Sequence, residues 1–435
     1  MTSHSPLAFR SLVLAVVAGC ASAPPAPVPP VTANEGAKIA SPPGSKRAYV
    51  GGTILPAPDA PAIPDGVLLV EGDRILALGS RKDVAVPEGA RVIDCHGATV
   101  AAAFWNAHVH FIEPRWQNAA SAPAKGLEEG LQAMLSRWGF AHAFDLGSRF
   151  ADTSAIRRRV ADGEVRGPAI ETTGSVYVAE GGQPVYVKFK LPELKTPEQA
   201  RAAVNAELDR AADAIKLMTA SVVAHPPSPV MPVPVVRAAT DAAHARGVLV
   251  FAHPTNRAGV LAAKDGGVDI LAHTAPADGP WSDEDAHSLV AAGMSVVPTL
   301  SLWRREIEPE SPEVAARYED VAIEQVRVFA AAGGTLLFGT DVGYRHEYDT
   351  TPEHELLARA GLPFAARLAM LTTAPAARFQ AGKATTSGRL APGMDADVVV
   401  LEGDPRQDAR AFANVRCTLR RGDTIYAASP GACGI

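Results

Sequence analysis

The sequence has no excess of basic residues, and this shortage limits the partners that the protein can have. Lys and Arg number 41 against 47 Asp and Glu, which gives a formal net charge of -6. Proteins that bind nucleic acid usually carry a basic patch or stripe, so no nucleic-acid partner is expected. Beyond the first 20 residues, the sequence also lacks an apolar run long enough to cross a bilayer. With 47% hydrophobic and 20% charged residues, the chain has the composition of a globular protein.

The amino-terminal segment has the pattern of an export signal. Arg10 precedes the short apolar stretch SLVLAVVAGC, which is typical of a secretory signal peptide and too short for a transmembrane helix. Its end, Val17-Ala18-Gly19-Cys20, resembles the bacterial lipoprotein signal, in which Cys20 becomes the lipidated first residue. We expect a signal peptide at 1–19, a Pro/Ala-rich tether at 20–45 and attachment to the outer membrane facing the periplasm. A soluble periplasmic or secreted protein is the alternative.

Cysteine is scarce, with four residues in the chain. If Cys20 carries lipid, Cys95, Cys417 and Cys433 remain, and the export signal leads us to expect them in an oxidising compartment. One disulfide and one free thiol are then expected, and the sequence does not choose the pair.

The chain divides into two β-rich ends and an alternating middle. Residues 46–100 and 381–435 contain short apolar runs separated by turn residues, which predicts one small β-sandwich domain formed from both ends of the mature chain. Between them, residues 101–380 alternate short apolar strands with amphipathic helices about eight times. This alternation predicts a (β/α)8 TIM barrel and thus an α/β fold. An open doubly wound sheet is less suitable, because no glycine-rich phosphate loop follows the first strand. The strands are expected at about 103–109, 140–144, 168–172, 213–218, 247–252, 268–272, 294–299 and 335–340.

Polar residues with metal-ligating chemistry stand where these strands end, which in a barrel is the active-site rim. A histidine that ends a strand is often only a hydrogen-bonded group, but several at one rim favour a metal site. The first strand supplies two histidines at alternate positions, so both rings point to the same side. A buried lysine on the fourth strand is costly unless it is neutralised or paired. The six candidates are His108, His110, Lys216, His253, His273 and Asp341.

The donor types favour zinc, since neutral imidazole and carboxylate oxygen bind Zn2+ at about 2.0–2.2 Å. Four histidines are too many for one open catalytic ion. Two ions about 3.5–4 Å apart would use them all and leave room for a bridging hydroxide. A bridging anion with two oxygens is then required, and Lys216 could supply it if carbon dioxide converts its amine to a carbamate.

The order His-x-His, Lys, His, His, Asp resembles the amidohydrolase superfamily, in its binuclear subtype with a carboxylated lysine. The stretches VFAHP, LAHTAP and APGMDADVVVLEGDP are most similar to the imidazolonepropionase-related group, which includes Xaa-Pro dipeptidases. The resemblance implies one ion held by His108, His110, Lys216 and Asp341, and a second by Lys216, His253 and His273. It also implies that Asp341 takes a proton from the bridging hydroxide and passes it to the leaving group. Ala102-Ala103 and Pro254-Thr255 depart from the usual pattern, which weakens a specific dipeptidase assignment.

The loops after the strands should determine the substrate. Each polar or aromatic residue there could be an ordinary surface residue, but together they suggest a pocket with aromatic walls and at least one cation. The substrate-binding candidates are His142, Tyr177, His225, Trp303, Arg304, Tyr344 and Arg345.

The resemblance and the six candidates imply an amidohydrolase in which a metal-bridging hydroxide cleaves an amide or peptide-like C–N bond in a small molecule, such as a dipeptide or an N-acyl amino acid. A phosphotriester or lactone hydrolase on the same metal centre is the alternative. A non-catalytic lipoprotein that binds a metal or solute is a second alternative. A dipeptide would need a cation such as Arg304 or Arg345 facing the metals, whereas a phosphotriester would need apolar subsites. The native metal and the oligomeric state stay open.

Overall fold

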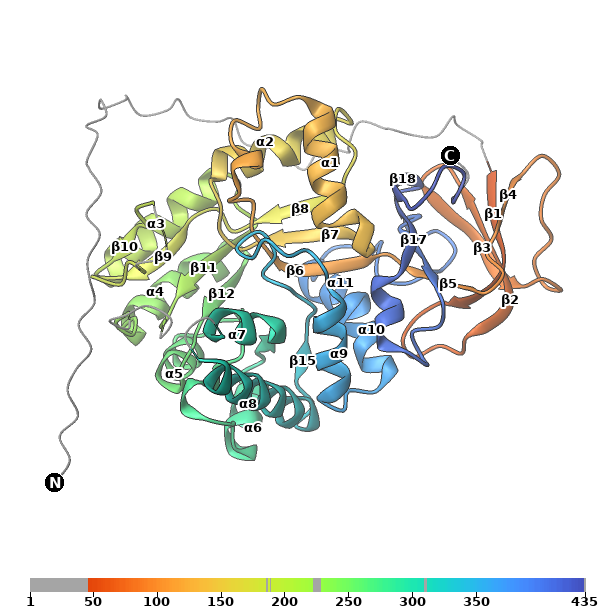
Figure 1. The fold of residues 1–435 in the computed structure, drawn as a ribbon. Helices are drawn as coiled ribbons and strands as arrows, with labels where there is room; N and C mark the ends of the chain where they lie inside the picture. The colour runs from red at the N-terminus through yellow and green to blue at the C-terminus, as the bar shows by residue number, and fades with distance from the viewer. Residues whose placement is uncertain (1–45, 185–186, 188, 222–227, 309–310, 434–435) are drawn as a thin grey trace.

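The computed structural model describes residues 46–184, 187, 189–221, 228–308 and 311–433. The expected signal peptide, the tether, Cys20 and His225 lie outside the described residues. Within these ranges the chain forms a β-rich part at one side and a larger part in which parallel strands alternate with helices (Figure 1).

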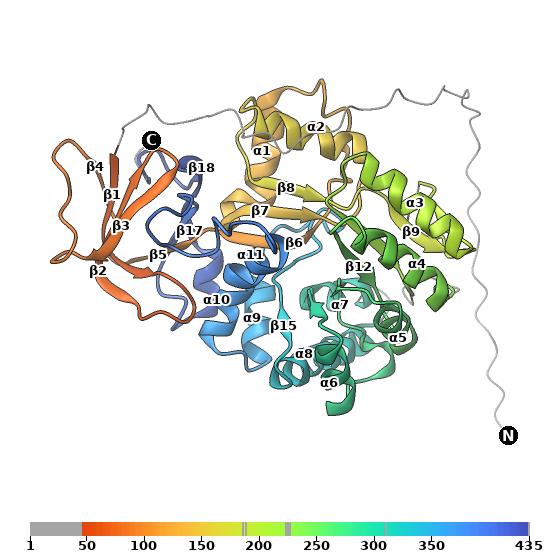
Figure 2. The same cartoon turned by 180° about the vertical axis from the view of Figure 1, so that it is seen from behind.

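Strands from both ends of the described chain share one sheet of eight strands in the β-rich part. Its hydrogen-bonded order is β18-β17-β16-β5-β1-β2-β3, and β4 pairs with β1. In Figures 1 and 2 the carboxyl-terminal strands β17 and β18 lie between β1–β4 and the larger part. The strands are β1 (Lys46–Leu55), β2 (Ile63–Glu71), β3 (Arg74–Ser80), β4 (Arg91–Asp94), β5 (Ala98–Ala102), β16 (Val398–Glu402), β17 (Val415–Arg420) and β18 (Asp423–Ala427).

This sheet is a single hydrogen-bonded path, whereas the sequence predicts the two facing sheets of a sandwich. The reason is β5, which pairs in parallel with β1 and in antiparallel fashion with β16, so strands of both chain ends are joined directly. A buried cluster that includes Tyr49, Val100 and Val400 packs these strands together.

This part of the chain also shows which of the three cysteines form the disulfide. Cys417 and Cys433 form a disulfide, and Cys95 is buried with a free thiol.

The eight strands that the sequence predicts for the larger part all occur within a few residues of their expected positions, and the described residues contain two further short strands, β9 and β10, that the sequence does not predict. All their pairings are parallel, and they form a sheet of three strands and a sheet of seven, in the order β6-β7-β8 and β10-β9-β11-β12-β13-β14-β15. Their bounds are β6 (Phe104–Val109), β7 (Phe140–Asp145), β8 (Ala169–Thr172), β9 (Val176–Ala179), β10 (Glu193–Leu194), β11 (Ala214–Met218), β12 (Leu249–His253), β13 (Ile270–Leu271), β14 (Ser295–Val296) and β15 (Thr335–Leu336).

The two parallel sheets are not one continuous barrel, but backbone hydrogen bonds join them at both gaps. Ala107 N–H donates to Phe338 O at 2.7 Å, which ties β6 to the segment after β15. Asp213 N–H donates to Thr172 O at 2.8 Å, which ties β8 to the start of β11. At the first gap, β15 is only two residues long, so few residues are left to pair with β6.

Helices between the strands cover the outside of these sheets (Figure 2). Several start at a side-chain cap that accepts a backbone N–H, as at Thr196, Asn256, Ser282 and Ser311. No helix among the described residues is long and apolar enough to span a bilayer. The α-helices are α1 (Ala124–Met134), α2 (Phe150–Ala161), α3 (Pro197–Asp209), α4 (Val233–His244), α5 (Arg257–Asp265), α6 (Asp283–Ala291), α7 (Leu300–Ile307), α8 (Pro312–Ala331), α9 (Thr351–Arg359), α10 (Phe364–Leu371) and α11 (Thr373–Phe379). Short 3-10 helices are η1 (Pro114–Trp116), η2 (Ser136–Trp138), η3 (Pro276–Asp278) and η4 (Ala409–Ala413).

Candidate metal centre

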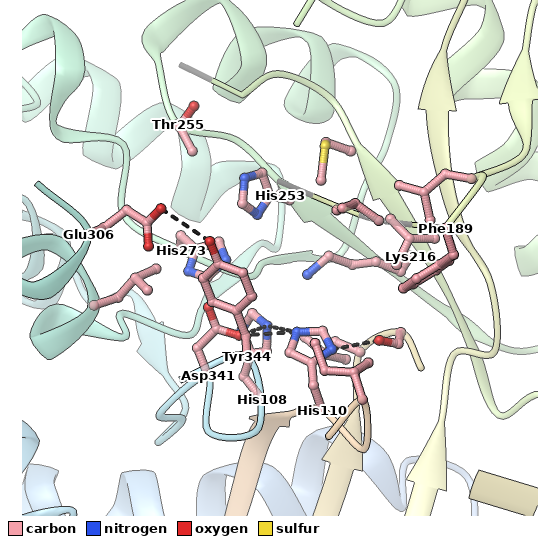
Figure 3. Close-up of a pocket in the computed structure, with 18 of the residues that line it drawn as sticks. His108, His110, Phe189, Lys216, His253, Thr255, His273, Glu306, Asp341 and Tyr344 are labelled. Atoms are coloured by element: carbon pink, nitrogen blue, oxygen red, sulfur yellow. Dashed lines mark hydrogen bonds and ion pairs between the residues drawn. The ribbon is translucent and has the colours of Figure 1, made fainter. Parts of the chain in front are cut away.

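All six metal-ligand candidates line one cavity at the carboxyl ends of the parallel strands (Figure 3). The cavity has a volume of about 290 Å3. Five different strand ends bring these residues together, as expected for a rim at which parallel strands terminate. The six residues are His108, His110, Lys216, His253, His273 and Asp341.

Hydrogen bonds behind three of the imidazoles fix which ring nitrogen faces the cavity. His108 Nδ1 lies 2.9 Å from Ala272 O and His110 Nδ1 lies 2.7 Å from Gly147 O, so each Nδ1 must carry the proton. His273 Nδ1 lies 2.6 Å from the hydroxyl of Thr299, which itself donates to Pro298 O. A neutral imidazole has one N–H, and therefore Nε2 of all three rings presents a lone pair.

These lone pairs converge on Asp341. His108 Nε2 and His110 Nε2 are 3.2 Å apart, and they lie 3.2 and 3.1 Å from Asp341 Oδ1. Ligand atoms about 2.0–2.2 Å from a common ion are separated by roughly 3.0–3.4 Å when the angle between them is near 90–110°. Ligand atoms of His108, His273 and Asp341 also lie within 4.8 Å of one another. The spacing is therefore that of side chains around a shared cation.

The protonation states of these residues also favour a bound cation. Without one, the unprotonated ring nitrogens and the Asp341 carboxylate would face each other with no proton between them. Burial lowers the pKa of His108 to about 4, despite the attraction of Asp341. Burial and the charge of Lys216 lower the pKa of His253 to about 3. At neutral pH these two rings are thus uncharged, and the buried His253 Nε2 has no hydrogen-bond partner among the residues that the structure describes. A divalent cation would satisfy the carboxylate and these nitrogens together, so the donor set fits a metal.

Lys216 is the remaining member of the rim, and its burial changes its chemistry. The residue is only 3% exposed in the middle of β11. Burial lowers the pKa of its ammonium group to about 7, although the charges of Asp341 and Asp145 act in the opposite direction. A large share of the side chain is then a neutral amine at neutral pH, which is the form that reacts with carbon dioxide.

The turn that carries Asp341 is strained in the backbone. Asp341 has φ 59°, a left-handed conformation that non-glycine residues seldom adopt. Two residues on, Gly343 has φ 97°, and a Cβ there would lie 1.7 Å from His110 O. Gly343 is therefore required for the close approach of this turn to the His108–His110 strand. Strain of this kind is often found at functional sites.

The predicted substrate residues divide into two groups, and two of them line the cavity. Trp303 is buried and its indole N–H donates to Thr274 Oγ1 at 2.7 Å. Tyr344 lies at the rim, where its hydroxyl is 3.1 Å from Glu306 Oε1. Tyr344 comes from the segment that follows Asp341, whereas Trp303 belongs to α7 and not to a loop.

Four other predicted substrate residues lie away from the cavity lining. The imidazole of His142 is 2.8 Å from Asp397 and stacks on Trp105. The Tyr177 hydroxyl donates to Ala203 O at 3.0 Å, towards α3. The other two, Arg304 and Arg345, bond to Glu319 and Ser301 respectively.

The placement of Arg304 follows from helical geometry. The sequence suggests a loop for Trp303 and Arg304, whereas both belong to α7. Successive helical residues are rotated by about 100°, so Leu302, Trp303 and Glu306 share the cavity face and Arg304 faces the other way. Recognition of LSLWRREI as a helix would have predicted both results.

Most of the cavity wall consists of apolar residues that the sequence analysis does not single out. Ile112 and Met218 follow His110 and Lys216 by two residues, so the period of a strand places them on the same side. The unpredicted polar lining residues are Thr255 and Glu306. The apolar lining residues are Ile112, Leu146, Val176, Val187, Phe189, Leu191, Met218 and Leu302.

A buried carboxylate behind the rim holds the loop that orients His110. Asp145, at the end of β7, accepts hydrogen bonds from Gly147 N at 3.2 Å and from Ser148 Oγ at 2.6 Å. Its other oxygen accepts from Thr153 Oγ1 at 2.9 Å and from Thr172 Oγ1 at 3.0 Å. Since Gly147 O in turn accepts from His110 Nδ1, Asp145 fixes the direction of the His110 ring through one residue, Gly147.

Comparison with solved structures places the whole chain among proteins of one fold. A protein from Bifidobacterium longum described as a prolidase has TM-score 0.74 and 24% identity, over 88% of this chain and 95% of that one. A Xaa-Pro dipeptidase with bound methionine has TM-score 0.74 and 20% identity, over 88% and 100% of the two chains. The ochratoxinase of A. niger has TM-score 0.72 and 19% identity, over 90% and 98%. These neighbours have a TIM barrel with a small β domain, which the two parallel sheets and the β-rich part match.

No curated protein matches the chain in sequence. The family model described as "Amidohydrolase family" does match, over residues 99–425. This range contains every metal-ligand candidate and most of the β strands at the carboxyl end. The chain belongs to the amidohydrolase family.

Proposed function

We propose that this protein is a metal-dependent hydrolase that cleaves an amide or related C–N bond in a small molecule. The observation that carries this proposal is the convergence of His108 Nε2 and His110 Nε2 on Asp341 Oδ1 at 3.1–3.2 Å inside a cavity. Membership of the amidohydrolase family and the dipeptidase-like neighbours support it. We also propose that the parallel strands act as one (β/α)8 barrel, with the site at its carboxyl-terminal rim.

Two divalent ions, with zinc as the default, would be held by the six rim residues. His108, His110 and Asp341 would hold one ion and His253 and His273 the other. Lys216 would bridge the two ions as a carbamate, formed when the neutral amine adds to carbon dioxide and releases a proton. Bound divalent ions supply Lewis acidity to the scissile group and make a hydroxide nucleophile available near pH 7.

The chain's own contribution to the reaction is to move one proton and to exclude water. Asp341 Oδ1 is buried at the centre of the site, where it would accept the proton of the attacking nucleophile. The carboxylate would be ionised when it accepts this proton, and it would then pass the proton to the leaving nitrogen.

The apolar walls keep one alternative open. A phosphotriester or lactone has no carboxylate and would also suit a cavity lined by residues such as Leu302, Met218 and Phe189. A dipeptide or N-acyl amino acid would instead use a cation near the metals. Metal uptake without turnover of any of these compounds would support the second alternative, a non-catalytic binding protein.

The test is metal analysis of the purified chain followed by a turnover screen. After loading with Zn2+ and bicarbonate, we expect two ions per chain and hydrolysis of at least one class among dipeptides, N-acyl amino acids and neutral amides. Isotope-labelled bicarbonate should give a carbamate signal in magnetic resonance spectra. That signal should be absent from Lys216→Gln and retained in the control Lys264→Gln, a lysine that contacts Ser288 on the outer surface. One ion or none would contradict the binuclear centre.

We further propose that the protein is exported and attached to the outer membrane through a lipid on Cys20. The support is the apolar stretch that ends in Val17-Ala18-Gly19-Cys20. Metabolic labelling with a fatty acid in a bacterial host should mark the wild-type chain and not Cys20→Ser. Equal labelling of both would contradict the proposal, and a cleaved but unlabelled wild-type chain would favour a soluble exported protein.

A further inference from the structure

The helix α7 begins beside the metal-ligand candidate His273, and the residue at its start uses its side chain in an unusual way. Thr299 precedes the first turn of α7, a position where a threonine hydroxyl commonly accepts a hydrogen bond from a backbone N–H of the helix. The Thr299 hydroxyl makes no such capping bond to α7. It donates to Pro298 O at 2.8 Å and lies 2.6 Å from His273 Nδ1. This hydroxyl therefore serves the ring of His273 and not the helix.

A carboxylate from another helix caps α7 instead. Glu353 of α9 accepts from Leu300 N–H at 2.9 Å with one oxygen and from Ser301 N–H at 2.8 Å with the other. These residues open α7, and N–H groups of a first turn have no partner within their own helix. Glu353 is buried, so its oxygens take the place that water fills at an exposed helix end. The cap from α9 thus leaves the Thr299 hydroxyl available to His273.

The backbone of Thr299 depends on the same contacts. Thr299 has φ 47° and ψ 49°, a left-handed conformation that β-branched residues seldom adopt. Such a conformation is unfavourable by itself and persists only where the surroundings impose it. The hydrogen bonds of Glu353 fix the two N–H groups that follow Thr299. A change in this backbone would move Cβ of Thr299 and with it the hydroxyl that faces His273.

The buried charge of Glu353 is compensated by the groups around it. Burial raises the pKa of Glu353, and the N–H donors of Ser301 and Leu300 and the charge of Arg345 limit this rise. Arg345 is itself buried, and it donates to Ser301 Oγ at 2.9 Å. A glutamine in place of Glu353 would remove the charge and would turn an NH2 donor towards a backbone N–H. Glu353→Gln should therefore disturb the start of α7 with little change in side-chain volume.

We propose that Glu353 is a positioning residue for the metal centre, because it holds the start of α7 in the conformation in which Thr299 orients the His273 ring. This inference rests on the proposed function, in which His273 is a metal ligand. A group that accepts from Nδ1–H fixes both the tautomer and the direction of a ligating imidazole. Glu353 would act on His273 through Thr299 and would touch neither the metal nor the substrate.

The first test needs no metal. Isotope labelling of the histidine nitrogens in the chelated full chain gives a ring N–H resonance for His273, assigned by its loss in His273→Gln. The Nδ1 proton should exchange slowly with water in the wild type and about tenfold faster in Glu353→Gln, because a hydrogen bond that holds its acceptor in place is lost. Equal exchange rates in the two proteins would overturn the inference, whether or not the protein is a hydrolase.

The second test is zinc affinity, measured by competition with a chelating dye. Glu353→Gln should bind one of its ions about 10–100-fold more weakly than the wild type does. One control is Glu355→Gln, a partly exposed acid of α9 that pairs with Arg410. The other is Glu319→Gln, a buried acid that bonds to α7 through Arg304. Both controls should keep the wild-type affinity, and an equal loss in Glu319→Gln would overturn the inference in favour of a general effect of packing.

A double variant tests whether the effect passes through the Thr299 hydroxyl. Thr299→Val removes the hydroxyl and should weaken zinc binding, whereas Thr299→Ser keeps it and should bind zinc nearly as well as the wild type. If Glu353 acts through this group, adding Glu353→Gln to Thr299→Val should lower the affinity by no more than about twofold further. Two losses that multiply would overturn the inference.

Two further provisions keep these outcomes distinct. If Glu353→Gln does not fold, Glu353→Asp replaces it in each measurement, since it keeps the charge but is one methylene too short to reach both N–H groups. Failure of the proposed function is a separate result, namely a wild-type chain that binds no zinc or that hydrolyses no compound in the turnover screen. The exchange rate of the His273 ring proton then decides the inference alone.

Discussion

The two ends of the parallel strands contain the same residue types and use them differently. At the cavity end, Asp341 Oδ1 faces the unprotonated Nε2 atoms of His108 and His110. At the end towards the β-rich part, Asp397 accepts from His142 Nε2 at 2.8 Å and from Arg421 N at 2.6 Å. Both carboxylates are buried. Asp397 thus accepts two hydrogen bonds, whereas Asp341 Oδ1 has no donor among the described residues, an arrangement that fits a bound cation.

Replacing each carboxylate by an amide tests whether Asp341 acts in turnover and Asp397 in stability. The largest effect is expected on turnover, at the cavity end. Asp341→Asn keeps the shape but cannot take a proton, so turnover should fall by about 10²–10⁴-fold. The unfolding temperature should change little when metal is bound. Steady-state kinetics on metal-loaded protein measures this, with the ion content determined in parallel. Turnover within about threefold of wild type would contradict the assignment of Asp341 as the proton acceptor.

The matched change at the other end is Asp397→Asn. The amide should weaken the contacts with His142 and Arg421 and lower the free energy of unfolding by about 1–3 kcal/mol. Turnover per folded molecule should stay near the wild-type value, because His142 does not line the cavity. Denaturant unfolding and kinetics together test this. A large loss of turnover without loss of stability would show that the two ends are coupled.

Acid should destabilise the metal-free cavity end in a defined pH window. Burial lowers the pKa of His108 from 6.5 to about 4 and that of His253 from 6.5 to about 3. Between about pH 6.5 and pH 4 the unfolded chain therefore binds protons that the folded chain does not. Stability should be lost as pH falls through this window, by on the order of 3 kcal/mol for His108 alone.

The measurement is denaturant unfolding of the chelated protein at a series of pH values. His108→Asn should reduce the slope in this window, since it removes one of the groups that titrate there. Bound metal should hold the rings unprotonated and delay the loss to lower pH. A free energy of unfolding that does not vary from pH 6.5 to 4 in the metal-free chain would contradict the burial of uncharged rings.

The two ends of the strands also differ in how well the sequence predicts them. Strand positions and the six metal-ligand candidates followed from apolar periodicity and from the rule that barrels act at the carboxyl ends of strands. The contact of His142 with Asp397 could not be predicted, because the two residues are 255 positions apart and no local pattern indicates the pair. Glu306 was overlooked because its direction depends on α7 being a helix. The Cys417–Cys433 pairing needed the packing of the final segment on β17.

A smaller effect should come from the group that positions a ligand without touching the cavity. In Asp145→Asn one oxygen of the carboxylate is replaced by a donor, which disturbs the contacts to Gly147 and Ser148 and thus the direction of His110. Affinity for zinc should fall by about 10–100-fold. Competition with a chelating dye measures it.

The control for this change is Thr153→Val, which removes a donor to the oxygen of Asp145 that does not hold the Gly147 turn. It should lower stability and leave zinc affinity close to wild type. If both variants lose affinity equally, the effect of Asp145 is one of general packing. A loss in Asp145→Asn alone supports orientation of His110 through the Gly147 carbonyl.

The smallest effect is expected on the outer face of the cavity end, at Arg304. The sequence suggests this arginine as a substrate contact, but its side chain is 49% exposed and bonds to Glu319. Arg304→Ala removes an exposed ion pair and leaves Glu319 paired with Arg359, so the free energy of unfolding should fall by less than about 1 kcal/mol. KM for any substrate should stay within about twofold of wild type, whereas Leu302→Ala, on the cavity face of the same helix, should raise it. Kinetics of the two variants side by side compare the faces directly. A rise in KM for carboxylate substrates in Arg304→Ala would show that this guanidinium reaches the substrate, contrary to its direction towards Glu319 in the structure.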